Sequence, residues 1–248
     1  PVNTGPALRE AMADWLRWRY SLPDGMLDTD AQVHPVFGTK EGLFSCILTA
    51  VLRKEDRLER AGRGHLRPIV VLPNPLYHVY IGAALTSGAE VIYAPCTAGT
   101  GFAPDLSVVP EDDWERVALV IATNPGNPTG TLLSAAFMKA AILRAREHDF
   151  TFLSDECYSE LYFDTKPLGA MDICRDMGGS LDNVWVVNSL SKRSGLPGLR
   201  SGFIAGDADR LEDLYYLRAY GGAQPPVALQ EASIRLWRAE THAQKFPA

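Results

Sequence analysis

Short apolar runs and amphipathic stretches alternate along this chain. A helical spacing of apolar residues occurs first at Leu8, Met12, Trp15 and Leu16. Further helices are predicted at about 41–53, after Tyr77, over 134–148, and after Asp207 and Val227. Apolar runs typical of buried strands lie between them, at 68–72, 89–93, 117–123, 150–155, 184–188 and 202–206. Repeated strand–helix units predict an α/β fold of three layers, α/β/α, with a mainly parallel sheet between the helices.

Composition narrows the class of protein. The chain has 248 residues, of which 46% are hydrophobic, enough for one large core. The net charge of -6 argues against nucleic acid or an anionic membrane as a partner. No apolar run approaches the roughly 20 residues of a membrane span, and no signal-like N-terminus is visible, so we expect a cytoplasmic protein. No metal-ligand spacing occurs among the cysteines, which are Cys46, Cys96, Cys157 and Cys174, and no metal site is predicted.

One lysine stands in a segment that suggests chemistry. Lys192 follows the apolar run 184–188, and Pro197 and Gly198 prevent a regular helix just beyond it. The resulting turn can bring Arg200 back toward the lysine. An amine, two hydroxyls and an arginine in one loop suit a cofactor that has an aldehyde and a phosphate, so pyridoxal phosphate is the candidate. A solvated basic loop explains this segment alone equally well.

Two further apolar runs also end in polar residues. The run 150–155 ends at Asp155, with Tyr158 three positions on, and the run 117–123 enters a turn, 124–130, rich in Asn, Pro and Gly. A carboxylate can hold the protonated pyridine nitrogen, and a tyrosine and an amide can donate to the phenolate oxygen. Ligands bind at the carboxyl ends of strands in open α/β sheets. Three polar clusters in that position favour a cofactor site.

These motifs resemble those of the fold-type I, class I/II aminotransferases, which use pyridoxal 5'-phosphate. The matching segments, 124–130, 155–158 and 189–202, stand in the order found in that family. The resemblance implies that Lys192 attaches the cofactor and moves the proton. It also implies that Asp155 holds the pyridine nitrogen.

The same resemblance implies the remaining cofactor contacts. Segment 38–44 looks like the family's phosphate-cradling turn at a helix start, and 74–80 looks like the segment whose aromatic stacks on the cofactor ring. The ring oxygen would be held by Asn127 and Tyr158. The phosphate would be bound by Thr39, Lys40, Ser189 and Arg200, and the ring face would be covered by Tyr77.

Within the family, segments 77–84, 156–162 and 191–203 resemble the succinyldiaminopimelate aminotransferases of bacterial lysine biosynthesis. This likeness implies ping-pong transamination of succinyldiaminopimelate with glutamate and 2-oxoglutarate. The substrates would be a small-molecule amino acid and a 2-oxo acid. Two alternatives stay open. One is an aminotransferase for another amino acid, or a lyase on the same scaffold. The other is a non-catalytic pyridoxal-phosphate-binding sensor domain.

The resemblance also implies parts of the enzyme that this chain lacks. The chain starts at Pro1, where the family already has an N-terminal arm, and stops at Ala248, before the small domain that supplies an arginine for the substrate carboxylate. We therefore expect residues 1–248 to be the pyridoxal-phosphate-binding large domain, truncated at both ends. A homodimer with shared active sites is implied, and an exposed aromatic strip is expected around Tyr77 and Tyr80.

Overall fold

One sheet organises the computed structural model, which describes residues 5–221 and 225–238. Within these residues seven strands pair in the order β1-β7-β6-β5-β4-β2-β3. The strands are β1 (Val33–Val36), β2 (Ile69–Asn74), β3 (Glu90–Pro95), β4 (Val117–Thr123), β5 (Thr151–Asp155), β6 (Val184–Ser189) and β7 (Gly202–Gly206). The α-helices are α1 (Pro6–Tyr20), α2 (Thr29–Gln32), α3 (Thr39–Arg60), α4 (His78–Thr86), α5 (Ala135–His148), α6 (Ala170–Asp176), α7 (Leu190–Arg193), α8 (Ala208–Gly221) and α9 (Val227–Arg238). Short 3-10 turns lie at Ala98–Thr100, Leu106–Val108, Glu111–Arg116 and Pro197–Leu199.

The strand directions confirm the predicted α/β fold with a mainly parallel sheet. Strand β7 runs antiparallel to β1 and β6, and the pairs among β2, β3, β4, β5 and β6 are all parallel. The sequence pattern missed β1, which has only four residues and includes Pro35. The helix predicted at about 41–53 is longer than expected, because α3 continues to Arg60.

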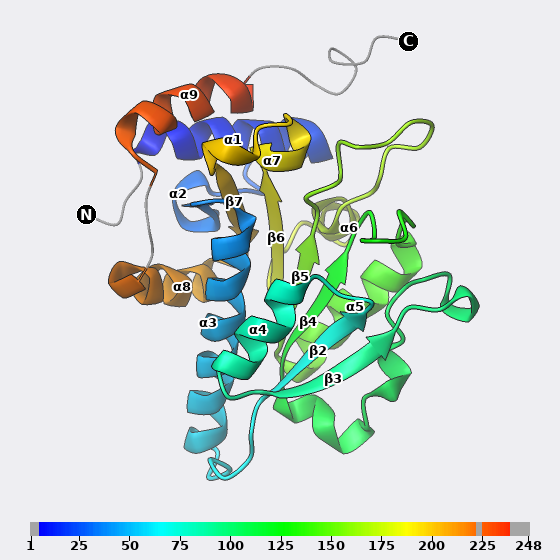
Figure 1. The fold of residues 1–248 in the computed structure, drawn as a ribbon. Helices are drawn as coiled ribbons and strands as arrows, with labels where there is room; N and C mark the ends of the chain where they lie inside the picture. The colour runs from blue at the N-terminus through cyan, green and yellow to red at the C-terminus, as the bar shows by residue number, and fades with distance from the viewer. Residues whose placement is uncertain (1–4, 222–224, 239–248) are drawn as a thin grey trace.

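Helices cover both faces of the sheet (Figure 1). Alternate residues of β4 point to opposite faces, as the period of a strand requires, with Val120 in one core and Leu119 in the other. The first core is closed by α1, α5, α6 and α9. The second is closed by α3, α4 and α8. This arrangement is the predicted three-layer sandwich.

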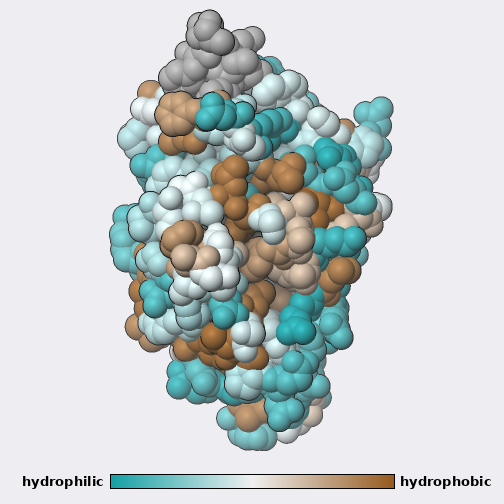
Figure 2. All heavy atoms as spheres, turned by 90° about the vertical axis from the view of Figure 1, so that its right-hand side faces the viewer, coloured by the Kyte–Doolittle hydropathy of each residue, from teal (hydrophilic) through white to brown (hydrophobic). Residues whose placement is uncertain are grey.

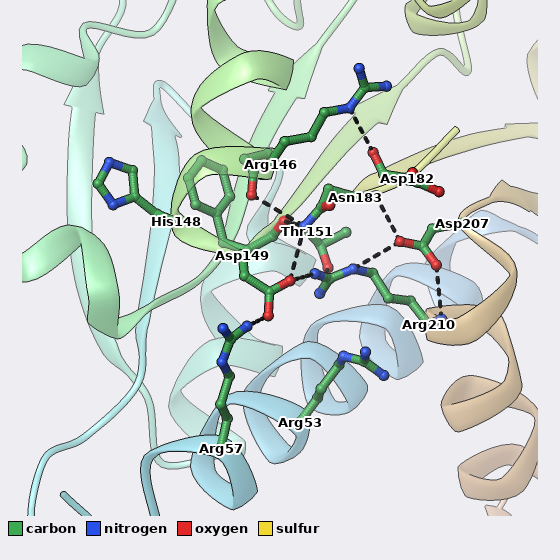
Figure 3. Close-up of polar contacts among 12 residues, drawn as sticks. Arg53, Arg57, Arg146, His148, Asp149, Thr151, Asp182, Asn183, Asp207 and Arg210 are labelled. Atoms are coloured by element: carbon green, nitrogen blue, oxygen red, sulfur yellow. Dashed lines mark hydrogen bonds and ion pairs between the residues drawn. The ribbon is translucent and has the colours of Figure 1, made fainter. Parts of the chain in front are cut away.

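A polar network joins three helices at the edge of the sheet where β5 begins (Figure 3). Asp149 ends α5 in the left-handed conformation (φ 49°) and pairs with Arg57 of α3 and Arg210 of α8. Arg210 is 4% exposed and also pairs with Asp207 (3.0 Å) and donates to Thr151 Oγ1 (3.1 Å). A buried arginine with several partners fixes the relative positions of the elements that it joins.

A cavity of about 660 Å³ opens beside this network. Its arginines are ion-paired: Arg53 with Asp213, Arg57 with Asp149, and Arg60 with Asp56. It lies away from the predicted site residues, and paired charges of both signs do not define a ligand. We therefore assign it no chemistry.

Strand β3 forms one edge of the sheet and is incompletely covered. Its first four residues are exposed or half-buried, and Tyr93 is 47% exposed. Figure 2 shows the side of the molecule that faces right in Figure 1, where hydrophobic residues gather near the middle among hydrophilic ones. Within the described residues, no helix is both long enough and apolar enough to cross a membrane.

Candidate active site

The predicted site residues meet at one edge of the sheet. Strands β2, β4, β5 and β6 are parallel neighbours, so their carboxyl ends lie together. The start of α3 and the turn after α7 complete a cavity of about 230 Å³. All nine predicted site residues line it, namely Thr39, Lys40, Tyr77, Asn127, Asp155, Tyr158, Ser189, Lys192 and Arg200. Other lining residues, which were not predicted, are Leu43, Tyr80, Thr123, Cys157, Ser191 and Pro197.

Asp155 lies at the end of β5 and is 5% exposed. Its Oδ2 accepts a 2.6 Å hydrogen bond from the Tyr80 hydroxyl, and its Oδ1 accepts one from the Cys157 backbone N–H at 3.2 Å. Burial raises the pKa of the Asp155 carboxyl, whereas these hydrogen bonds lower it. The carboxylate is thus oriented from two sides and faces the cavity.

Tyr80 corrects the expectation of an exposed aromatic strip. Its side chain is 0% exposed, and its hydroxyl lies 3.2 Å from Thr123 Oγ1 as well as contacting Asp155. Burial raises the pKa of the Tyr80 phenol well above its usual range, so the group stays a donor. Tyr77 is half-buried and packs edge-to-face on Tyr80, with ring centroids 5.7 Å apart.

Lys192 occupies the single turn of α7, directly after β6. Its neighbours Leu190 and Arg193 are buried, whereas Lys192 is exposed toward the cavity. Its Nζ lies 5.8 Å from the centre of the Tyr158 ring. A primary amine beside a tyrosine can attack an aldehyde and afterwards carry a proton.

The irregular turn brings Arg200 to the same cavity as Lys192, as predicted. Arg200 has the left-handed conformation (φ 53°), and its Nη1 and Nη2 donate to the carbonyl oxygens of Pro197 (2.9 Å) and Phe37 (3.2 Å). Gly38 has φ 80°, which favours glycine, and a Cβ added there would meet the Arg200 guanidinium. The guanidinium therefore lies against the turn that starts α3, where the backbone N–H groups of the first helical turn are free to bind an anion.

The Ser189 hydroxyl indicates that an anion fits between Arg200 and the start of α3. It is buried, lines the cavity and has no hydrogen-bond partner within the described residues. Buried polar groups are almost always paired, so this hydroxyl has capacity for a ligand. Together with Thr39, Lys40 and Arg200, it forms a donor set suited to a phosphate. The cavity thus offers an amine, a carboxylate and an anion site, which fit the aldehyde, ring nitrogen and phosphate of pyridoxal phosphate.

Buried amides hold the loops that carry the other site residues. Asn124 donates to the Leu168 carbonyl (2.6 Å) and accepts from the Leu133 N–H (2.9 Å), which fixes the turn containing Asn127. Asn188 donates to the Glu156 carbonyl (2.7 Å) and accepts from the Ser189 N–H (2.7 Å). The ends of β5 and β6 are therefore tied together.

Comparison with known proteins agrees with this geometry. The family model described as aminotransferase class I and II matches residues 1–243. The chain belongs to the class I and II aminotransferases. Enzymes of this family depend on pyridoxal phosphate.

Individual members of the family show how far the likeness extends. An LL-diaminopimelate aminotransferase of Desulforudis audaxviator is 30% identical over 223 residues, 88% of this chain and 51% of the relative. A 4-dedimethylamino-4-oxo-anhydrotetracycline transaminase, OxyQ of Streptomyces rimosus, is 31% identical over 247 residues, 99% of this chain and 60% of the relative. The crystal structure of an aminotransferase from Neisseria meningitidis Z2491 superposes with a TM-score of 0.86 at 39% identity, covering 97% of this chain and 58% of that one. The chain thus spans about half the length of the curated relatives that it matches.

Two features of this site were not predicted from the sequence. Tyr80 lies three residues after Tyr77 and was expected in an exposed aromatic strip, so the hydrogen bond from its hydroxyl to Asp155 was not predicted. Glu41, at the start of α3, accepts from Arg218 at both carboxylate oxygens (2.9 and 3.0 Å) and from the Phe37 N–H (3.1 Å). This pair holds the turn before Thr39, and no local pattern signals a partner 177 residues away.

Proposed function

We propose that this protein is a pyridoxal-phosphate-dependent aminotransferase that moves an amino group between an amino acid and a 2-oxo acid. The proposal rests on the cavity of about 230 Å³, which is lined by an amine, a buried carboxylate and a set of donors for an anion. When bound, the cofactor supplies an electron-accepting ring that makes the substrate's α-proton removable.

We assign the residues of this chain to that chemistry as follows. Lys192 attaches the cofactor and, once released, carries the proton between the substrate α-carbon and the cofactor. Asp155 holds the protonated ring nitrogen. Tyr158 and Asn127 hold the ring oxygen, and Tyr77 covers the ring. The phosphate is bound by Thr39, Lys40, Ser189 and Arg200.

Labelling of the cofactor lysine tests the assignment directly. The protein is loaded with pyridoxal phosphate, reduced with borohydride and digested, and the labelled peptide is identified. We expect the label on Lys192, its loss in Lys192→Arg, and its retention in the matched variant Lys40→Arg, since Lys40 is the other lysine of the cavity. A label on Lys40, or none on a folded protein, would refute the proposal.

For the substrate, we propose a diaminopimelate compound, with succinyldiaminopimelate and glutamate as the pair. The support is the sequence likeness and the relatives named for LL-diaminopimelate. The relative named for an anhydrotetracycline makes a different amino acceptor the alternative. Amino transfer by the full gene product should be compared for LL-diaminopimelate, its N-succinyl derivative and a panel of other amino acids. A protein that binds cofactor but converts none of them would favour the sensor alternative.

We further propose a cytoplasmic homodimer. The apolar side chains near the β3 edge give physical support, because large exposed apolar areas commonly mark interfaces (Figure 2). Tyr93 of β3 is 47% exposed, and Phe163, in the loop after Tyr158, is 97% exposed. Sedimentation of the full gene product at several concentrations should show a dimer. A monomer that is fully active at all of these concentrations would rule out an active site shared between two subunits.

A further inference from the structure

Arg193, the residue after Lys192, is held away from solvent against two tryptophans. It is 4% exposed, and its guanidinium carbon lies 5.2 Å from the ring centre of Trp15 in α1 and 5.0 Å from that of Trp237 in α9. Its Nη1 and Nη2 donate to the carbonyl oxygens of Leu236 (3.0 Å) and Trp237 (3.4 Å). Those carbonyls belong to the last turn of α9, where a helix presents partial negative charge to a cation. Cation–π contacts on two rings add to this attraction.

Trp237 also contacts the far end of segment 190–201, which carries Lys192 and Arg200. Its indole Nε1 donates to Ser201 Oγ (3.1 Å), and Ser201 directly follows Arg200. The Ser201 carbonyl in turn accepts from the Leu190 N–H at 3.0 Å. Trp237, which is 1% exposed, thus contacts the immediate neighbours of both Lys192 and Arg200.

The local structure needs such support. Helix α7 has four residues, too few to define its own position, because an isolated turn of helix is unstable. The turn beyond it includes Gly195 at φ 65°, which adds backbone freedom. In Figure 1, α7 lies beside α1 and α9 at the top of the sheet. The position of Lys192 therefore depends on the anchors Leu190 and Arg193 rather than on α7 itself.

We propose that Arg193 and Trp237 are positioning residues that couple the placement of α9 to the cofactor site, by fixing Lys192 and Arg200 at the same time. This inference rests on the proposed function. Coupling between two sites is reciprocal, so cofactor bound at Lys192 and Arg200 must stabilise the docking of α9. Displacement of α9 must conversely weaken the hold on the cofactor.

Two measurements test the coupling without relying on turnover. The first is the dissociation constant of pyridoxal phosphate, measured from its absorbance. The second is hydrogen exchange of the α9 backbone amides with and without cofactor. The variants are Arg193→Met, which keeps an apolar chain and removes the charge, Arg193→Lys, which keeps the charge, and Trp237→Phe, which keeps a ring and removes the bond to Ser201. The matched control is Trp114→Phe, since Trp114 is also buried and its Nε1 has no partner within the described residues.

In the wild type, cofactor should slow exchange in α9. Arg193→Met should raise the dissociation constant by about tenfold or more, because small displacements of a binding group are costly, and should abolish the protection of α9. Arg193→Lys should restore part of both effects. Trp237→Phe should weaken binding by a smaller factor, and Trp114→Phe should match the wild type.

The outcomes separate this inference from the proposed function. If wild-type protein takes no label at Lys192, the proposed function fails. If it takes the label but Arg193→Met and Trp237→Phe retain wild-type affinity and cofactor-dependent protection of α9, the coupling alone is wrong. Circular dichroism checks that each variant folds. Should Arg193→Met fail to fold, Arg193→Lys and Trp237→Phe decide the question, because both retain most of the packing.

Discussion

The hydroxyl of Tyr80 lies 2.6 Å from Oδ2 of Asp155 and donates a hydrogen bond to it. Both side chains are at most 5% exposed, so this bond is protected from competing water. Tyr80 is carried by α4 and Asp155 by β5, which means that the bond joins two elements across the base of the cavity. It leaves the carboxylate with a fixed direction. The next two predictions concern Asp155 and Tyr80 in turn.

Asp155→Asn is expected to slow proton transfer far more than it weakens cofactor binding. An amide fills the same space but cannot hold the protonated ring nitrogen by charge. Loss of one preorganised electrostatic group typically costs on the order of 100-fold or more in rate. Cofactor affinity should change by less than about tenfold, because the phosphate contacts remain. A single-turnover assay with glutamate, alongside a cofactor titration, measures both. Equal rates for variant and wild type would refute the role of the carboxylate.

Tyr80→Phe is expected to act on the same step through Asp155. The hydrogen bond from Tyr80 lowers the pKa of the Asp155 carboxyl against the effect of burial, so its removal should raise that pKa further. A hydrogen bond to a charged group is worth about 1.5–3 kcal/mol, which predicts a roughly 10- to 100-fold slower proton transfer. Tyr216→Phe, at a position that is 59% exposed, is the control. Unchanged single-turnover kinetics in Tyr80→Phe would contradict the prediction.

Gly38→Ala is expected to damage the phosphate site specifically. Gly38 has φ 80°, and an added Cβ would clash with the Arg200 guanidinium, which has to move. Gly25 offers a matched control, because it has φ 79° and nothing within 4 Å of an added Cβ. Both alanines carry a backbone cost on the order of 1–3 kcal/mol, and Gly38, with ψ 156°, lies in a region that only glycine readily adopts. Only Gly38→Ala should also weaken pyridoxal phosphate binding, by about tenfold or more. Equal cofactor affinity in the two variants would show that Arg200 does not bind the phosphate.

The sequence predicts those site residues that lie at or just beyond the carboxyl end of a strand. Asp155 ends one apolar run and Lys192 lies shortly after another, and the carboxyl ends of parallel strands necessarily meet. Tyr80 lies inside an apolar helix, where a tyrosine is usually a core residue. Its partner Asp155 lies 75 positions away, beyond the range of any local pattern. The antiparallel direction of β7 was likewise not predictable, because a buried strand has the same apolar pattern in either direction.

Glu156 predicts a pH dependence of stability. Its side chain is 0% exposed, and it accepts hydrogen bonds from the Tyr20 hydroxyl of α1, from Ser154 Oγ (2.8 Å) and from the Ala170 N–H (2.8 Å). Burial raises the pKa of the Glu156 carboxyl from 4.5 to about 7, although these hydrogen bonds and Arg19 oppose the shift. The folded pKa lies above the unfolded one, so the folded state favours the protonated acid. The stabilising contribution is therefore complete below pH 4.5 and is lost as the pH rises through about 7.

Glu156→Gln cannot ionise and should therefore remove this dependence. Its amide keeps the shape of the protonated acid, with one oxygen to accept from Ser154 and Ala170. The free energy of unfolding of the wild type, relative to the variant, should fall by about 1–3 kcal/mol between pH 5 and pH 8. Urea unfolding at the two pH values measures this difference and cancels the contributions of other groups. Glu59→Gln, at an exposed position of α3, should follow the wild type at both pH values. If the free energies of unfolding of wild type and Glu156→Gln change in parallel with pH, Glu156 ionises in the folded protein as it does in water. The prediction would then be wrong.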